Sequence, residues 1–333
     1  MSDAEPQGPL GDVEVVVQDA FGNTTDAALD VSIGLSANPG GGAVSGTLTR
    51  QSVSGVAVFD DLSIDVAADG YALGASATDL TDGASAAFDV ALEFVEVDIG
   101  TFFGCGRTTT GAAYCWGFGP DQRGDATGVS QINVPSRVAG GHQFVALSVG
   151  PNHSCGFRMG DGVVLCWGAG SSGQLGSGMV NQSVPTPVTG GTAFTSVSAG
   201  FSHTCGIRAS DGRVLCWGNA GNGRLGNNTI TPNVGEPTLT ADAAAYLAVS
   251  AGGSHTCGIR ASDQRVMCWG FAANGRLGNN TITPDVLTPQ PTSNSSAYSS
   301  ISAGSAHTCG TRSTDGSAFC WGNGTSGQLG NAD

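Results

Sequence analysis

The sequence predicts an all-β protein on three observations. Glycine accounts for 54 of 333 residues, and only 12% of the residues are charged. Glycine in a helix interior costs about 1 kcal/mol relative to alanine, whereas Val and Thr favour strands. A segment with two cysteines and one tryptophan recurs along the second part of the chain, and its hydrophobic residues alternate rather than follow a helical period.

Residues 1–93 contain no Cys or Trp and predict a separate β-sandwich. Alternating runs such as VEVVVQD, ALDVSIGLSA and GVAVFDDLSI are separated by turn sequences such as NPGGG and ADG. Six or seven short strands in a segment of this length are typical of an immunoglobulin-like sandwich. We therefore predict an immunoglobulin-like domain over residues 1–93, held together by packing alone.

Residues 94–333 are built from a repeat. Each unit opens with an aromatic residue and an alternating run, as in FVALSVG and FTSVSAG, and successive units start 50 or 52 residues apart. Three or four short strands per unit at this period are typical of a β-propeller blade. The predicted units are 94–143, 144–193, 194–245, 246–297 and a partial fifth, 298–333.

The two cysteines of each unit face each other in a predicted hairpin. In HTCGIRASDGRVLCWG, a loop at residues 209–212 places Cys205 opposite Cys216. In the first unit the cysteines are one residue closer, and a shorter loop ending at Gly111 keeps them opposed. Opposed Cα atoms lie about 4.5 to 5.5 Å apart, which suits a disulfide. The predicted disulfides are Cys105–Cys115, Cys155–Cys166, Cys205–Cys216, Cys257–Cys268 and Cys309–Cys320.

Zinc and reduced thiols are the alternatives to these disulfides. A histidine precedes the first cysteine by two residues in four units, at His153, His203, His255 and His307. It would supply a third ligand, but no fourth ligand recurs, and structural zinc takes four. Redox catalysis has less support, because no Cys-x-x-Cys motif is present. Five disulfides indicate an oxidising compartment, and so an extracellular or cell-surface protein.

A tryptophan follows the second cysteine of every unit and points to the opposite face of its strand. The five are Trp116, Trp167, Trp217, Trp269 and Trp321. We expect these residues to pack between neighbouring blades, with a carbohydrate-binding stack as the alternative. We expect the repeated histidines to be buried hydrogen-bonding groups rather than catalytic bases.

Charge and motif content argue against several functional classes. The net charge is −15 and lysine is absent, which is the opposite of the basic face that a nucleic-acid-binding protein presents. No apolar run is long enough to span a membrane, and MSDAEPQGPL lacks the regions of a signal peptide, so either the protein is cytosolic or its export signal lies outside this sequence. No catalytic motif appears, and we expect neither an enzyme nor a bound cofactor or metal.

The string VSAGFSHTCGIRASDGRVLCWGNAGNGRLG, residues 197–226, resembles the repeat of the regulator of chromosome condensation (RCC1) family. Its last element recurs as GQLG or GRLG in four units, whereas the first unit has DQRGD at residues 121–125. The resemblance covers residues 94–333 and implies a β-propeller, usually of seven blades. The chain holds four complete units and part of a fifth, too few for the usual ring. We expect a fragment of a longer protein; the alternatives are that another chain supplies the remaining blades or that the arc stays open.

Two further resemblances concern location. The paired cysteines are similar to those of extracellular members of the family, in secreted bacterial proteins and in the ectodomains of plant receptor kinases. Residues 15–49 resemble a bacterial immunoglobulin-like module. Together they imply an exported bacterial protein in which an immunoglobulin-like spacer presents a disulfide-stapled propeller.

These resemblances imply a binding function rather than catalysis. The expected partner is a protein or a glycan, or further copies of the chain that associate head to tail through unclosed blade faces. One alternative is guanine-nucleotide exchange on a small GTPase, which the extracellular interpretation opposes. The other is inhibition of a secreted enzyme such as a β-lactamase.

Overall fold

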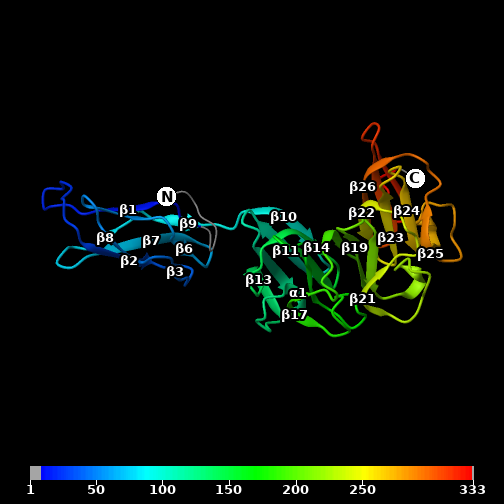
Figure 1. Ribbon diagram of the computed structural model, residues 1–333, viewed down its shortest axis with the longest axis horizontal. Helices are drawn as coiled ribbons and strands as arrows, with labels where there is room; N and C mark the ends of the chain where they lie inside the picture. The colour runs from blue at the N-terminus through cyan, green and yellow to red at the C-terminus, as the bar shows by residue number, and fades with distance from the viewer. Residues whose placement is uncertain (1–8, 332–333) are drawn as a thin grey trace. The chain divides into compact units, whose positions relative to one another are not determined.

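The computed structural model describes residues 9–331, and the chain divides into two compact units, Met1–Phe94 and Val95–Asp333 (Figure 1). The prediction of an all-β protein is confirmed. Among the described residues, helical structure is limited to α1 (Pro120–Arg123) and the 3-10 turns η1 (Gly221–Gly223) and η2 (Ala273–Gly275).

From residue 9 onward, where the structure describes the chain, the first unit contains nine strands in three hydrogen-bonded groups. β4, β2, β7 and β8 form one sheet, with β9 also paired to β7, while β1 pairs with β5 and β3 with β6. Their bounds are β1 (Val13–Val16), β2 (Asp30–Ala37), β3 (Val44–Ser45), β4 (Thr49–Gln51), β5 (Val56–Phe59), β6 (Ser63–Ile64), β7 (Ala68–Ser76), β8 (Gly83–Ala84) and β9 (Phe88–Val90). The immunoglobulin-like assignment of this unit stays a prediction.

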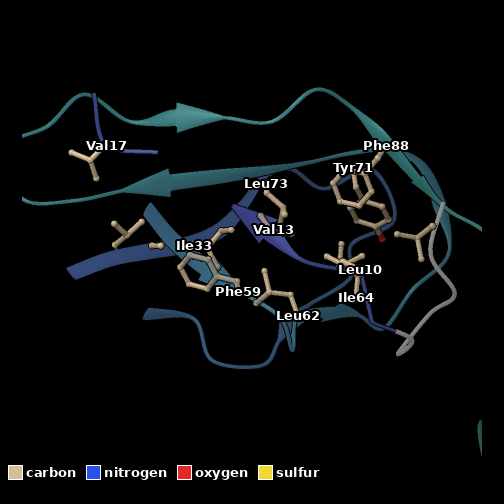
Figure 2. Packing of buried hydrophobic residues seen from close by; sticks show 13 residues of the cluster. Leu10, Val13, Val17, Ile33, Phe59, Leu62, Ile64, Tyr71, Leu73 and Phe88 are labelled. Atoms are coloured by element: carbon tan, nitrogen blue, oxygen red, sulfur yellow. The ribbon is translucent and has the colours of Figure 1, made fainter. Parts of the chain in front are cut away.

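Alternation along these strands produces the core of the first unit. Val31 and Ile33 of β2 are buried while the residues between and beside them are more exposed, as the period of two requires. Phe59, Leu62 and Tyr71 are fully buried in the same cluster (Figure 2). The buried hydroxyl of Tyr71 donates a hydrogen bond to the carbonyl of Val66 at 3.0 Å, so the core leaves this polar group satisfied.

The second unit consists of five antiparallel sheets in chain order, which we call blades 1 to 5. Blades 1 to 4 have four strands each and blade 5 has three within the described residues. Blades 1 and 2 comprise β10 (Phe94–Ile99), β11 (Phe103–Thr108), β12 (Ala113–Phe118), β13 (Gln131–Arg137), β14 (Phe144–Val149), β15 (His153–Arg158), β16 (Val164–Gly168) and β17 (Gln182–Pro187).

The remaining blades repeat this arrangement. Blades 3 to 5 comprise β18 (Phe194–Ala199), β19 (His203–Arg208), β20 (Val214–Gly218), β21 (Val234–Leu239), β22 (Tyr246–Ala251), β23 (His255–Arg260), β24 (Val266–Gly270), β25 (Val286–Pro291), β26 (Tyr298–Ala303), β27 (His307–Arg312) and β28 (Ala318–Gly322). The first strands of successive blades lie side by side, β14 next to β18, β18 next to β22 and β22 next to β26. This stacking is that of propeller blades.

All ten cysteines are paired across the central hairpins of the blades. Cys205 lies directly opposite Cys216 in the register of β19 and β20, and Cys105 opposite Cys115 in that of β11 and β12. The five disulfides are the predicted ones, and each joins Cα atoms 4.1 Å apart. The one-residue deletion in blade 1 is absorbed by the turn, where Gly111 has a positive φ of 86°.

Reduction of the disulfides is expected to destabilise the second unit alone. Each bond closes a loop of 10 or 11 residues, which corresponds to about 2 to 3 kcal/mol in the loop-entropy model. Thermal unfolding with and without a phosphine reductant measures this effect, and the first unit, which has no cysteine, is the internal control. An unchanged unfolding midpoint for the second unit after complete reduction would contradict the expectation.

Candidate functional site

Three of the repeated histidines are fully buried between neighbouring blades. His153 Nε2 lies 2.7 Å from Oγ1 of Thr204, the residue that directly follows the histidine of the next blade. The same contact recurs at 2.8 Å in two further pairs, His203–Thr256 and His255–Thr308. The histidines therefore connect each blade to its successor.

The partner of each threonine fixes the protonation of the histidine. Thr204 Oγ1 donates a hydrogen bond to the carbonyl of Gln174 at 2.7 Å, and the hydroxyl has only one proton to give. Thr204 must then accept from His153, so the proton of the neutral imidazole lies on Nε2. Nδ1 of His153 is buried and has no hydrogen-bond partner within residues 9–331. The imidazole of His153 is therefore neutral and donates its hydrogen bond through Nε2.

Burial makes these histidines difficult to protonate. It lowers the pKa of His153 to about 4. For His255, burial and then the nearby charges of Arg276, His307 and Arg224 lower the pKa to about 3. Burial is also the main reason why the pKa of His203 lies well below its usual value, with Arg224 next in importance. These groups are structural donors rather than bases poised near neutral pH.

The tryptophans complete the same interfaces. Trp217 Nε1 donates to the carbonyl of Gln174 at 2.9 Å, so this carbonyl accepts from both Thr204 and Trp217 of the next blade. The equivalent bonds are Trp269 to Arg224 at 2.9 Å and Trp321 to Arg276 at 3.0 Å. Trp217 also packs on Phe194 of its own blade at 5.8 Å between ring centroids. Its complete burial leaves no face for a sugar.

A serine near the end of the first strand of blades 2, 3 and 4 makes a third contact between blades. Ser148 Oγ accepts a hydrogen bond from the backbone N–H of Ala199 at 2.9 Å. The equivalent pairs are Ser198–Ala251 at 3.0 Å and Ser250–Ala303 at 2.9 Å. Each interface from blade 2 onward is thus defined by three groups on one blade: the serine hydroxyl, the histidine and the carbonyl of the GQLG-type element.

The interface between blades 1 and 2 has different chemistry. Phe103 replaces the histidine there. Asp98 replaces the serine and accepts from the backbone N–H of Val149 at 2.7 Å, with Glu96 accepting from Leu147 at 3.3 Å. Carboxylates therefore take over the role that a hydroxyl has elsewhere.

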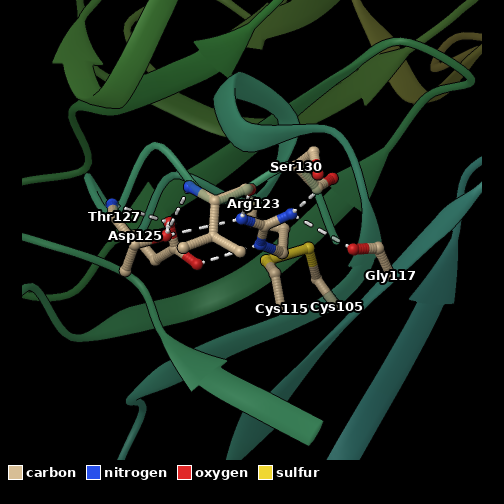
Figure 3. Close-up of polar contacts among 8 residues, drawn as sticks. Cys105, Cys115, Gly117, Arg123, Asp125, Thr127 and Ser130 are labelled. Carbon is tan, nitrogen blue, oxygen red and sulfur yellow. Dashed lines mark hydrogen bonds and ion pairs between the residues drawn. A yellow bond between two sulfur atoms is a disulfide. The ribbon is translucent and has the colours of Figure 1, made fainter. Parts of the chain in front are cut away.

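The DQRGD segment of blade 1 contains a buried ion pair (Figure 3). Arg123 occupies the position of the buried Leu175 in blade 2, and Arg123 and Asp125 have side-chain exposures of 0% and 1%. Arg123 Nε donates to Asp125 at 2.9 Å, and Nη1 donates to the carbonyls of Gly117 and Ser130 at 3.1 and 3.4 Å. The short helix α1 and the left-handed Gly124 after it place these two side chains together.

Asp125 also organises its own loop. It accepts from the backbone N–H and the hydroxyl of Thr127 at 3.1 and 2.8 Å, as Asn227 accepts from Thr229 in blade 3. Burial acts to raise the pKa of Asp125, but the hydrogen bonds from Arg123 and Thr127 outweigh it, and the pKa lies below its ordinary value. The carboxylate stays ionised in the folded protein.

The repeated aspartates lie in the hairpin turns and cap them. Asp211 accepts two bonds from Arg208, at 2.9 and 2.6 Å, and one from the backbone N–H of Arg213 at 3.2 Å. The bond from Arg208 is the main cause that lowers the pKa of Asp211 to about 2. The equivalent pairs are Arg158–Asp161, Arg260–Asp263 and Arg312–Asp315. Each of these carboxylates is therefore occupied by hydrogen bonds from residues of its own hairpin.

Exposed apolar side chains recur in the loops that follow the GQLG-type elements. Val180, Ile230 and Ile282 lie four residues after the last glycine of the element in blades 2, 3 and 4, with exposures of 60%, 51% and 62%. Val129 of blade 1, at 49%, occupies the corresponding loop. We call these four residues the apolar loop row. Exposed apolar residues at equivalent positions on a rigid scaffold are candidates for partner contact.

Models of the regulator of chromosome condensation (RCC1) repeat match the second unit in two sets of segments. One model matches residues 194–224, 247–276 and 298–328, and the other matches 161–207 and 211–259. The second unit is an RCC1-like repeat β-propeller. The matched segments lie in blades 2 to 5 and leave out β14 and β15 of blade 2 and β25 of blade 4, while all of blade 1 lies outside them.

Several known proteins are similar to parts of this chain in sequence or in structure. Human E3 ubiquitin-protein ligase HERC2 is 35% identical over 92 residues, which is 27% of this chain and only 2% of HERC2. The structure of Prp20p from Saccharomyces cerevisiae has a TM-score of 0.64 at 17% identity and covers 96% of this chain and 85% of its own. Human WBSCR16 has a TM-score of 0.57 at 18% identity, covering 71% and 66%. At these identities the two structures show the fold alone.

Two further observations concern residues 9–331. No helix in this range has the length and apolar character needed to cross a bilayer. No group of three or more His, Cys, Asp or Glu side chains in the range is arranged to hold a metal ion. Sequence reasoning missed the Arg123–Asp125 pair and the threonine partners of the histidines. A hydroxyl residue directly after each repeated histidine was the available signal, at Ser154, Thr204, Thr256 and Thr308.

Proposed function

We propose that the protein is a secreted or cell-surface binding protein of bacterial type, in which the RCC1-repeat unit contacts a protein or glycan and the N-terminal unit acts as an immunoglobulin-like spacer. The observation that carries this proposal is the disulfide in every blade, which favours an oxidising compartment. RCC1 repeats are a regulatory or binding fold, and the protein is proposed to bind rather than to catalyse.

The apolar loop row is the proposed contact surface. Its four side chains are each about half exposed or more, on loops anchored by Asx-type hydrogen bonds such as that from Thr229 to Asn227 at 2.7 Å. The disulfides and the contacts between blades hold these loops on a stiff support. A stiff support reduces the ordering cost of binding.

The proposal is tested with a variant that carries Val129→Ser, Val180→Ser, Ile230→Ser and Ile282→Ser together. Binding of the parent and the variant to a glycan array and to the secreted and surface proteins of the source cell is compared. The parent is expected to retain a specific partner that the variant binds at least tenfold more weakly, with the same thermal unfolding. Equal binding by both would contradict the proposed surface, and ten free thiols in protein from its native source would contradict the proposed location.

Guanine-nucleotide exchange is the second candidate function, because the solved structure of Prp20p is described together with its binding to Gsp1p and histones. Accelerated nucleotide release from a small GTPase would support it. Inhibition of a secreted enzyme such as a β-lactamase is the third, and an inhibition assay with the pure protein tests it. Head-to-tail self-association stays a prediction that sedimentation velocity tests.

A further inference from the structure

Two neighbouring strands of the first unit each have an edge without a partner strand within residues 9–331. β1 pairs with β5 and β8 pairs with β7, but β1 and β8 do not pair with each other. Ahead of β1, Leu10 N–H donates to the carbonyl of Leu62 at 2.9 Å and Pro9 bridges Ser63. The residues just before β1 therefore lie beside the start of β6 and do not cover the edge that faces β8.

The free edge of β1 consists of the backbone groups of Glu14 and Val16. Val17 N–H donates to the carbonyl of Gly55 at 2.8 Å, in step with the register of β1 and β5. Residues along an antiparallel strand bond to their partner strand alternately, so the N–H and carbonyl groups of Glu14 and Val16 point away from β5. Such a row of groups is a template for a further strand.

A groove lies between the free edge of β1 and β8. It has a volume of about 260 Å³, and Val13, Ile33 and Leu73 of the core cluster contribute to its lining (Figure 2). A second hollow of about 450 Å³ extends from Val17 to Leu80. The groove therefore follows β1 and offers apolar contacts to alternate side chains of an added strand.

The rim of this groove is acidic. Asp12 and Glu14 line the groove and Asp79 lines the second hollow, and all three are exposed. Within residues 9–331 none of the three forms an ion pair, since Arg50, the one basic residue of the first unit, pairs with two aspartates between β5 and β6. Residues 1–93 hold fifteen of the 27 acidic residues of the chain and one of its 12 basic residues. This charge attracts a basic partner and repels a second copy of the unit.

We propose that the free edge of β1 binds a basic, extended segment of a partner protein, which adds to β1 as a further strand. Its backbone pairs with Glu14 and Val16, and its apolar side chains face Ile33 and Leu73. Its lysine or arginine side chains lie on the opposite face, beside the acidic rim. The inference goes beyond the proposed function, in which this unit is a spacer, and does not depend on what the apolar loop row binds.

Two other uses of this edge predict different behaviour. If two copies paired through β1, Asp12 and Glu14 of both copies would come together, and like charges opposite each other across strands are destabilising. If the acidic side chains served only to keep the edge from aggregating, a basic segment would gain nothing from the main-chain groups of β1.

The test uses the full chain and a capped seven-residue peptide of alternating lysine and valine, with a glutamate and valine peptide as its control. Amide hydrogen exchange is followed by NMR. The basic peptide is expected to slow exchange at Glu14 and Val16 at least tenfold. The amides of Val13, Val15 and Val17, which face β5, should change little. The acidic peptide should affect neither set.

Proline substitutions separate the two edges of the β1–β5 pair. Val16→Pro removes an N–H that takes no part in the pairing with β5, as an edge strand tolerates. It should weaken binding of the basic peptide at least tenfold without changing thermal unfolding. Val58→Pro is the matched control, because Val58 lies opposite Glu14 and its N–H points to the other edge of β5. This variant should bind the peptide as the parent does.

The combined variant Asp12→Asn and Glu14→Gln tests the charge without a change in the backbone. It should also weaken binding at least tenfold, whereas Asp30→Asn with Asp69→Asn removes the same charge outside the groove and should have a smaller effect. Failure of the basic peptide to bind, equal binding of both peptides, or binding without protection of Glu14 would overturn the proposal. Protection of that amide that grows with protein concentration in the absence of peptide would identify a second copy as the occupant and overturn it too.

Discussion

At pH 5 the second unit is expected to be less stable than at pH 7.5, by about 2 kcal/mol from His153 alone. The pKa of His153 is about 4 in the folded protein and 6.5 in an unfolded chain. The unfolded chain therefore binds protons that the folded chain does not, and stability falls as the pH drops below 6.5. His203 and His255 act in the same direction.

Urea unfolding followed by tryptophan fluorescence measures this effect, because all five tryptophans lie in the second unit. The range from pH 7.5 to pH 5 avoids titration of carboxylates such as Asp211, whose pKa is about 2. His153→Gln should remove about 2 kcal/mol of the pH dependence, which is the part that this histidine contributes. His142→Gln is the control for a half-buried histidine without a threonine partner. Equal stability at the two pH values would contradict the prediction.

The sequence predicted those features that depend on short separations along the chain. The strands follow from alternation, and the opposition of Cys205 and Cys216 follows from the length of one turn. The repeat period located the blades, because each blade is a single continuous segment. These features are local, so no knowledge of how the blades stack is needed to infer them.

The hydrogen-bond partners of the histidines depend on how the blades stack, so they could not be inferred from local features of the sequence. His153 and Thr204 are 51 residues apart and meet only because blade 3 packs on blade 2. That the histidines would be buried hydrogen-bonding groups was predicted, but their partners were not. Arg123 was missed for a related reason. A charged residue at a position that holds leucine elsewhere indicates exposure, and only the structure shows that Asp125 is buried beside it.

Loss of Asp125 is expected to have the largest effect of any single substitution in blade 1. Asp125→Ala leaves Arg123 charged, buried and without its carboxylate, which typically costs about 3 to 5 kcal/mol. It also removes the acceptor for the two bonds from Thr127. Arg123→Leu is also expected to lower the free energy of unfolding, because Asp125 then stays buried without its cation. Both free energies of unfolding are measurable by urea denaturation at pH 7.5.

The double variant Arg123→Leu with Asp125→Asn separates the ion pair from the loop geometry. It converts the blade 1 segment to the Leu-Gly-Asn order of blades 3 and 4, in which asparagine accepts from the threonine two residues later, as Asn227 does from Thr229. A buried ion pair replaced by apolar packing is often neutral or stabilising. The double variant should therefore recover most of the stability that either single substitution loses. If its loss equals the sum of the losses of Arg123→Leu alone and Asp125→Asn alone, the pair is not coupled, and the buried charges are stabilised by their separate backbone contacts.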